Sequence, residues 1–408
     1  MDMGIQATTR WSVVGVSILA GVVAAAHIGK VPTVIPALRG ELGLGLVAAG
    51  WVVSMFNTLG SACGIVQGMI GDTLGHRRSA LVGLLLLAIG GGVGALSSDE
   101  VLLLIGRCIE GVGFISVVVS CPGLILAATA PRDRRLTFGL LGVYMPTGVA
   151  IALATAPFIE AALGWRGLWM VLAGVSLGMA ALLAWITREL PGNDAVPGAG
   201  TVRGVADDLL MTLRQPGLWW LAAAFTAYTV QWSSLLVWLP SVLMETRRTD
   251  AVGAAGLTAL IAAANAPGGV LGAWLLHCRI PRGQLVVGAN AAMGLCCIGI
   301  FSPTLSDQTR FALCLLFSGL GGILPSAVLG GTAVHASGPR QIGAANGMVI
   351  QGSNLGQLIG PLTAAGLVSL FGNWDSVRSF LVGAAMLGVI AGLLVEQSER
   401  RLSYSEAD

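Results

Sequence analysis

The sequence predicts an all-α polytopic membrane protein in which twelve transmembrane helices form two pseudo-symmetric six-helix bundles. Three observations support this prediction: the composition, the number of long apolar segments, and an internal repeat. Of the 408 residues, 55% are hydrophobic and 10% are charged, with a net charge of +2. A soluble chain of this size would carry about 25% charged residues. The shortage of charge indicates a membrane protein, and the near-neutral balance indicates that it has no nucleic-acid partner.

Twelve segments are apolar over a length that can cross the ~30 Å hydrocarbon core as a helix. Helix is the expected state because lipid offers no partner to unpaired backbone groups. The first segment begins after Arg10 and is longer than the apolar part of a cleavable signal peptide. The predicted spans are 12–36, 46–67, 79–96, 101–129, 137–159, 167–187, 217–243, 252–277, 285–302, 309–333, 343–369 and 378–395.

The arginines between the spans predict the orientation of the chain. Fourteen lie in connections on one side of the membrane and six on the other. Cytoplasmic connections carry an excess of basic residues, so both termini are expected in the cytoplasm. The chain is therefore predicted to be a multi-pass protein of the cell inner membrane.

One long connection divides the chain into two halves of six spans. It contains proline, glycine and charges of both signs, as expected for an exposed loop. The predicted divisions are an N-terminal bundle at 1–187, a cytoplasmic central loop at 188–216, a C-terminal bundle at 217–395 and a cytoplasmic tail at 396–408.

The two halves also look like copies of each other. A shift of 208 residues places Gly111 on Gly319, Gly148 on Gly356 and Gly164 on Gly372, with Trp165 and Trp374 one position out of step. A chain with 59 glycines gives chance matches, but one shift that holds over a long stretch is stronger evidence. Internal repeats of this kind are typical of transporters.

A glycine-rich turn between the second and third spans contains the most specific motif. It reads Gly68-Met-Ile-Gly71-Asp72-Thr-Leu-Gly75-His76-Arg77-Arg78. This turn resembles the G-x-L-a-D-r-x-G-r-r signature of the major facilitator superfamily, although Thr73 and His76 replace residues that are usually basic. Span four contains Arg107, Gly111 and Gly113, which are similar to that family's R-x-x-x-G-x-G motif, and the Gly164-Trp165-Arg166 turn is also familiar from it.

The resemblance to the major facilitator superfamily, of bacterial type, covers the whole chain. It implies a transporter in which the two halves rock around a central cavity. It also implies that the turn acts as a conformational latch on the cytoplasmic side. The latch residues would be Gly68, Asp72, Gly75, Arg77 and Arg78.

Three charged residues lie inside apolar spans, where charges are costly and therefore functional candidates. They are Lys30, which is the only lysine of the chain, Arg107 and Glu110. At ~1.5 Å rise per residue, Lys30 is roughly 13 Å and Arg107 about 10 Å below the outer surface. The resemblance places spans one and four along the central cavity. We therefore expect Lys30 and Arg107 to bind an anionic substrate, and Glu110 and His27 to be candidates for proton coupling.

Structural roles remain open for these charges. Lys30 can extend its ammonium group toward the outer surface, helped by a helix disturbance at Pro32. Arg107 and Glu110 are three residues apart and can simply neutralise each other. Other polar or aromatic residues in the spans are candidate substrate ligands, although such side chains commonly bond neighbouring helices. They are Trp51, Asn57, Tyr144, Gln231, Trp232, Asn265, Gln351 and Asn354.

Together these features favour a secondary transporter that moves a small organic or inorganic anion by alternating access, with proton symport as a hypothesis. We expect a monomer without cofactor or metal. The seven cysteines lie in or beside apolar segments without ligand spacing, and no nucleotide-binding loop or nucleophile arrangement indicates an enzyme. One alternative is an exporter of drugs or amphiphilic metabolites by proton antiport, which predicts an acidic cavity that Glu110 alone supports. Another is a non-transporting sensor or receptor on the same fold, which would be expected to carry long soluble extensions.

Overall fold

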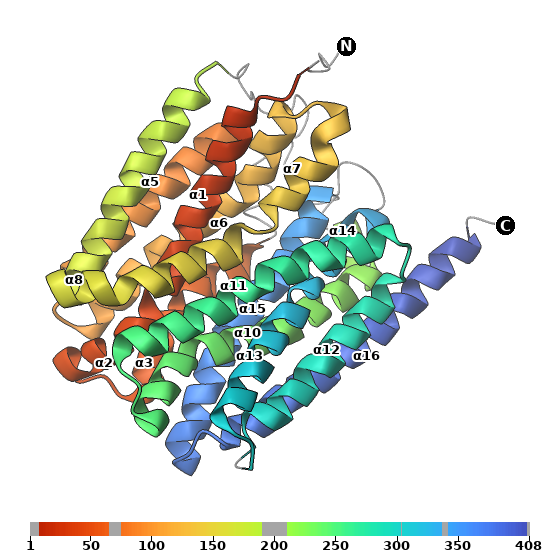
Figure 1. Ribbon diagram of the computed structural model, residues 1–408. Helices are drawn as coiled ribbons and strands as arrows, with labels where there is room; N and C mark the ends of the chain where they lie inside the picture. Colours follow the sequence, from red (N-terminus) through yellow and green to blue (C-terminus); the bar gives the residue numbers. More distant parts are fainter. Residues whose placement is uncertain (1–7, 65–74, 190–209, 303, 337–341, 406–408) are drawn as a thin grey trace.

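The computed structural model describes residues 8–64, 75–189, 210–302, 304–336 and 342–405, and every regular element within them is a helix. Figure 1 shows these helices in two groups, with the red-to-yellow N-terminal half beside the green-to-blue C-terminal half. The predicted all-α class is confirmed. The helices of the first half are α1 (Trp11–Gly29), α2 (Val31–Leu42), α3 (Leu46–Ser54), η1 (Met55–Asn57), α5 (His76–Ala95), α6 (Glu100–Ala128), η2 (Pro131–Asp133), α7 (Arg134–Leu141) and α8 (Tyr144–Ile186).

The second half is built in the same way. Its last helix continues to Ser405 through part of the segment where a tail was predicted, while most of the predicted central loop, 190–209, lies outside the described residues. The helices are α10 (Pro216–Arg247), α11 (Ala251–His277), α12 (Arg282–Ile300), α13 (Asp307–Gly321), α14 (Ile323–His335), α15 (Ile342–Phe371) and α16 (Ser376–Ser405).

The helices account for all twelve predicted spans. Among the described residues, ten helical segments are long and apolar enough to cross a membrane. One of them is the 43-residue α8, which holds two successive spans because Gly164 interrupts it with φ 69°. The remaining span is α10, whose 32 residues are long enough but include several polar side chains. The fold is therefore the predicted pair of six-helix bundles.

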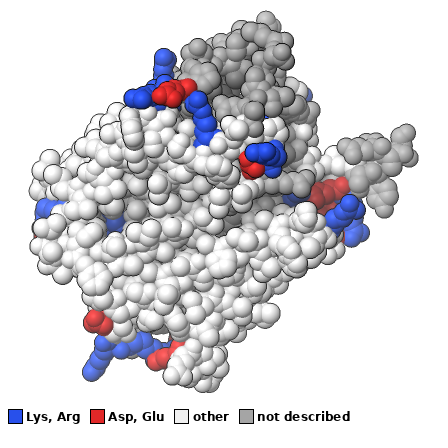
Figure 2. Space-filling model, turned by 45° about the horizontal axis from the view of Figure 1, so that its top comes forward, with Lys and Arg blue, Asp and Glu red and all other residues white. Residues whose placement is uncertain are grey.

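The outer surface of the helices is suited to lipid. Large apolar side chains such as Leu295, Leu387 and Trp185 are more than 60% exposed. Figure 2 shows charged side chains mainly toward opposite margins of this face, with uncharged surface across much of the middle. Because a soluble protein rarely exposes large contiguous apolar patches, this surface is accounted for by the bilayer.

The first span bends where the sequence contains proline. α1 ends at Gly29 and α2 begins at Val31, so Lys30 lies at the junction, with its backbone N–H donating to the carbonyl of Ala26 at 3.0 Å. Pro32 has no N–H to continue the hydrogen-bond ladder of α1. The break therefore follows from the local sequence, and it places Lys30 on a bend inside the bundle.

Close helix crossings repeat in the two halves. At Gly148 a Cβ would collide with the carbonyl of Val22 on α1, and at Gly356 one would collide with the carbonyl of Thr226 on α10. The helix turns that contain Gly164 and Gly372 both use a positive φ, 69° and 71°. These equivalent positions show that the glycine repeat in the sequence reflects equivalent packing in the two bundles.

Among the described residues, the two bundles meet where α8 packs against α11, α3 and the following η1 against α15, and α2 against α10. At one end of this interface Arg39 approaches Glu245, with 4.0 Å between Nη1 and Oε1. Glu245 also accepts a hydrogen bond from the indole of Trp374 at 3.1 Å. In the first half, Trp165 donates equivalently to Glu41 at 2.6 Å. A shift of 204 residues relates Glu41 to Glu245, so the repeat extends to these polar contacts.

The turn at Gly164 provides a test of the fold. We expect Gly164→Ala to destabilise the protein by about 1 kcal/mol or more, because an L-residue at positive φ is strained. Gly174→Ala is the matched control: Gly174 is inside the same helix and a Cβ there has open space, so a slight gain of about 0.5–1 kcal/mol is expected. Unfolding by SDS titration in mixed micelles measures both. Equal stabilities for the two variants would contradict the strain argument.

Candidate functional site

The charged residues predicted inside the spans form one buried cluster in the N-terminal bundle. Glu110 Oε1 lies 2.5 Å from Lys30 Nζ and 3.0 Å from His27 Nδ1, and its Oε2 lies 2.5 Å from Arg107 Nη1. His27 Nε2 contacts the hydroxyl of Ser176 at 2.9 Å. All four titratable side chains are at most 1% exposed. We call His27, Lys30, Arg107 and Glu110 the charged cluster.

The local sequence explains how these groups converge. His27 is on α1 and Lys30 follows its end, whereas Arg107 and Glu110 are one turn apart on α6. α5 and α6 approach closely at Gly90 of α5. A Cβ added to Gly90 would collide with the backbone of Glu110 on α6. Glycine at such a crossing lets two backbones come together. The carboxylate is thereby enclosed among three helices.

Arg107 has contacts beyond the cluster. Its Nε donates to the carbonyl of Val52 at 2.9 Å and its Nη1 to the carbonyl of His27 at 3.0 Å, while its guanidinium lies 4.5 Å from the ring centroid of Phe56. Its Nη2 is buried and has no hydrogen-bond partner among the described residues. Because arginine cannot give up its proton and offers only donors, this nitrogen needs an acceptor from elsewhere.

The charges of the cluster do not cancel. With His27 neutral, Lys30 and Arg107 supply two positive charges against the single negative charge of Glu110. Lys30 Nζ also lies 4.2 Å from the ring centroid of Trp169, where the face of the indole attracts a cation. An excess positive charge away from water is costly. The cluster is therefore suited to an additional anionic group.

The C-terminal bundle has neutral polar groups in the corresponding region. Gln231 donates to Asn290 Oδ1 at 3.1 Å, and its own Oε1 is buried without a partner among the described residues. The indole of Trp232 donates to the hydroxyl of Ser318 at 3.2 Å. The shift of 204 residues that relates α1 to α10 places His27 on Gln231, and the shift of 208 places Glu110 on Ser318. Equivalent positions therefore carry titratable groups in the first half and neutral polar groups in the second.

Asn265 completes this neutral group. Its Nδ2 donates to the hydroxyl of Tyr228 at 3.0 Å and to the carbonyl of Ser318 at 2.9 Å. Gln231, Trp232 and Asn265 are all at most 5% exposed. These predicted substrate ligands therefore hydrogen-bond to neighbouring helices within the C-terminal bundle.

The family model for the Major Facilitator Superfamily matches residues 16–349. The chain belongs to the Major Facilitator Superfamily. The protein named "Probable sulfoacetate transporter SauU" of Cupriavidus necator is 25% identical over 399 residues, covering 93% of this chain and 92% of its own. The 3-(3-hydroxy-phenyl)propionate transporter of Escherichia coli is 26% identical over 356 residues, covering 86% and 85%.

The fold agrees with solved structures of this superfamily. A bacterial homologue of the human lysosomal transporter Spinster, crystallised in an inward-facing and occupied conformation, superposes with a TM-score of 0.73 at 16% identity. The match covers 96% of this chain and 97% of the other. The superposition confirms the fold, and the family match makes the chain a multi-span membrane protein of the superfamily.

The superfamily motif on α6 has a direct structural explanation. A Cβ on Gly111 would collide with the carbonyl of Phe56 in η1, and one on Gly113 would collide with the carbonyl of Gly83 in α5. The two glycines thus let α6 pack against both neighbours while Arg107 crosses toward α3. The motif combines one buried cation with the close packing that encloses it.

Several candidate residues lie where the two halves of this superfamily member meet. Asn57 and Asn354 are each 2% exposed, and each has a buried Oδ1 without a partner among the described residues. Ser54 is the last residue of α3, directly before η1, which holds Asn57, and its Oγ is also buried without a partner among the described residues. Gln351 Nε2 reaches across the halves to the carbonyl of Ala62 at 3.4 Å. This interface contains polar atoms that can receive a ligand or water.

Two aromatic candidates have other surroundings. Trp51 is 38% exposed on α3. The ring of Tyr144 packs against Gly21 of α1. A Cβ added to that glycine would lie 3.0 Å from Tyr144 Cδ2. Among the interactions of the described residues, none joins Trp51 or Tyr144 to the charged cluster. Their roles as substrate ligands remain predictions.

The motif turn is described only in part. Gly68 and Asp72 lie outside the described residues. Gly75 precedes α5 with φ 82°, and Arg77 donates to Thr187 Oγ1 at 2.9 Å and to the carbonyl of Ala184 at 3.0 Å, while Arg78 is exposed. Arg77 therefore ties the start of α5 to the end of α8.

The second half holds an equivalent arginine. Arg282 at the start of α12 donates to the carbonyl of Ala327 at 2.7 Å and pairs with Glu399 on α16. His335 Nε2 lies 3.6 Å from the same carboxylate. Residues 278–281, which connect α11 to α12, include no acid, and the acid that pairs with Arg282 comes from the last helix.

Sequence reasoning missed two members of the site, Ser176 and Trp169. Both are on the second span of α8, where they contact His27 and Lys30. A serine and a tryptophan are ordinary in such a span, so only their positions relative to α1 distinguish them. No pattern in the sequence reports those positions.

Proposed function

We propose that this protein is a secondary active transporter of small organic anions, coupled to protons and working as a monomer in the inner membrane with both termini in the cytoplasm. Substrate would reach a site near the middle of the membrane by alternating access between the halves. The observation that supports this most is the charged cluster, in which two buried cations share one carboxylate and Arg107 Nη2 has no partner among the described residues. A carboxylate or sulfonate of the cargo supplies the acceptor that this nitrogen lacks.

The same cluster suggests how protons are coupled to the anion. A cargo anion that binds Arg107 competes with Glu110 for the same guanidinium. Once displaced, the Glu110 carboxylate loses one of its two cationic partners and gains a proton more readily, directly or through His27, which lies 3.0 Å away. One anion and one proton entering together leave the buried charge unchanged, which avoids the cost of adding net charge away from water. Symport of the two is the proposed mechanism.

The names of the two relatives described above are consistent with this cargo. Sulfoacetate and 3-(3-hydroxyphenyl)propionate, after which the two relatives described above are named, are both organic acids that are anionic at neutral pH. They differ in size and in aromatic character, so what they share is the acidic group. That shared group is the part of the cargo that the charged cluster would bind.

Uptake into proteoliposomes tests the proposal. We expect an inward proton gradient to drive uptake of at least one radiolabelled acid from a panel containing sulfoacetate and 3-(3-hydroxyphenyl)propionate, with acidification of the lumen in step with the anion. Proton-driven uptake of ethidium into inverted vesicles, with no anion transport, would instead support an exporter. Failure of every compound in counterflow would support a non-transporting sensor.

The motif turn is proposed to act as the latch between conformations. In that role Asp72 would pair or cap across the halves in one state only. Asp72→Asn is then expected to slow uptake while the order of preference among substrates stays the same. Competition by the acid panel measures that order, and a changed order would count against the latch.

A further inference from the structure

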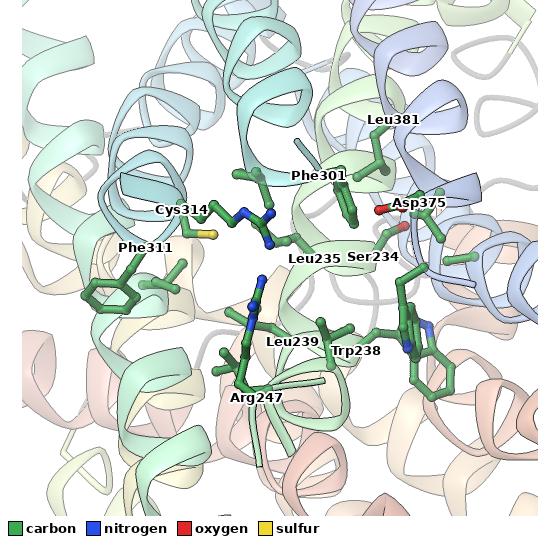
Figure 3. Close-up of a pocket in the computed structure, with 18 of the residues that line it drawn as sticks. Ser234, Leu235, Trp238, Leu239, Arg247, Phe301, Phe311, Cys314, Asp375 and Leu381 are labelled. Carbon is green, nitrogen blue, oxygen red and sulfur yellow. The ribbon is translucent and has the colours of Figure 1, made fainter. Parts of the chain in front are cut away.

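A cavity of about 340 Å³ lies inside the C-terminal bundle, away from the charged cluster. It is lined by residues of six helices, from α10 to α16, near the end of the bundle where α10 finishes and α13 begins. The volume is at the lower end of the range for pockets that hold a small organic molecule. Figure 3 shows aromatic and aliphatic side chains around it, together with charged groups at Arg247 and Asp375.

The walls of the cavity are largely aromatic. Trp238 and Trp374 lie with ring centroids 5.8 Å apart, and Phe301 and Phe311 are on other sides. The polar edges of both indoles are already occupied, since Trp238 donates to the carbonyl of Pro361 at 3.0 Å and Trp374 donates to Glu245. What the indoles can offer a ligand is therefore their apolar surface.

Two guanidinium groups line the same cavity. Arg247 pairs with Asp307 at 2.9 Å, and in Figure 3 its guanidinium points toward the middle of the drawn residues. Arg310 donates through Nη2 to the carbonyl of Ser302, whereas its Nε is buried and has no partner within the described parts of the chain. Of the two acids that line the cavity, Asp307 is already paired and Asp375 is exposed. The group without a partner is thus a donor, which requires an acceptor oxygen from a ligand.

The equivalent position in the first half carries a longer side chain than the one at the cavity. The shift that relates Glu41 to Glu245 places Lys30 on Ser234, and Ser234 lines the cavity. Lys30 fills its own bundle by reaching Glu110 and Trp169. The short side chain of Ser234 cannot do this, so the C-terminal bundle retains a cavity.

We propose that this cavity is a second binding site, for an amphiphilic organic carboxylate whose acidic group lies between Arg247 and Arg310 and whose apolar body packs on Trp238, Trp374 and Phe311. Carboxylates suit guanidinium groups because the two planar groups form paired hydrogen bonds. The site is separate from the charged cluster and does not depend on the transport proposal.

Equilibrium dialysis of radiolabelled 1-naphthoate against the purified full-length protein in detergent tests this site. The wild type is expected to bind saturably, Arg310→Gln at least tenfold more weakly, and Arg310→Lys between the two. Arg378→Gln is the matched control, because Arg378 is exposed near the same end of the bundle. Lys30→Met reports binding at the charged cluster, so the saturable binding that this variant retains and Arg310→Gln loses is assigned to the cavity. The neutral analogue 1-naphthalenemethanol is expected not to compete.

Several results would overturn the proposal. The first is that the wild type shows no saturable binding of naphthoate. The second is that Arg310→Gln, eluting as a folded monomer, binds naphthoate as tightly as the wild type does. The third is that 1-naphthalenemethanol competes as well as naphthoate itself. Loss of binding in Lys30→Met but not in Arg310→Gln would assign the naphthoate to the charged cluster. Arg310-dependent retention of phosphatidylglycerol, with no naphthoate binding, would assign the cavity to a lipid.

Discussion

Glu110→Gln is expected to destabilise the protein by about 3–5 kcal/mol, because it leaves two buried cations without their shared carboxylate. Glu110 contacts Lys30 and Arg107 at 2.5 Å each, and all three are fully enclosed. SDS titration in mixed micelles measures the loss. Glu160→Gln is a suitable control because Glu160 is only partly buried and is on another helix, α8.

A second substitution distinguishes charge imbalance from simple loss of packing. If the cost of Glu110→Gln arises from uncompensated charge, Lys30→Met in the same chain should recover part of it, because one of the two cations is removed. The non-additivity of the pair is expected to be at least about 1 kcal/mol, as for residues in direct contact. Strictly additive effects would contradict the electrostatic account of the cluster.

Lys30→Met is expected to separate stability from transport. Without Lys30, Glu110 still pairs with Arg107 and His27, so no buried acid is left alone and the excess positive charge disappears. Methionine also packs well against an aromatic ring such as that of Trp169. The variant should therefore unfold at or above the SDS fraction of the wild type. Anion uptake should nevertheless fall at least tenfold, because the cluster no longer has an excess of positive charge.

The fold could be predicted from the sequence because its main features are local. Apolar segments show where helices cross the membrane, Pro32 marks the break beside Lys30, and Gly164 and Gly372 mark turns that need a positive φ. These features depend on neighbouring residues in the chain. The structure places them as the sequence indicates.

The site could be predicted only in part, because its contacts are not local. The rarity of charge within the spans identified Lys30, Arg107 and Glu110, which the structure brings together. Helical periodicity does not report which neighbouring helix a side chain meets, so the contact from His27 to Ser176, 149 residues away, could not be seen. For the same reason, the partners of Gln231 and Arg282 on distant helices became evident only in the fold.

The two halves differ at the buried positions that form the charged cluster in the first half. The N-terminal bundle has charged groups at positions where the C-terminal bundle has Gln231, Ser234 and Ser318. The repeat therefore keeps the backbone crossings and the contacts of Glu41 and Glu245 to tryptophan, while the buried polar groups inside the bundles diverge. In the proposed mechanism the first half binds the acidic group of the cargo and the proton, and the neutral half contributes hydrogen bonds and shape.

The most direct test of this account is uptake of radiolabelled organic acids into proteoliposomes under an inward proton gradient, with wild type and Lys30→Met reconstituted at equal density. The account predicts proton-driven uptake of an organic anion by the wild type and at least a tenfold lower rate in the variant, although the variant is as stable as the wild type. Equal anion uptake by the two proteins would contradict the role of Lys30.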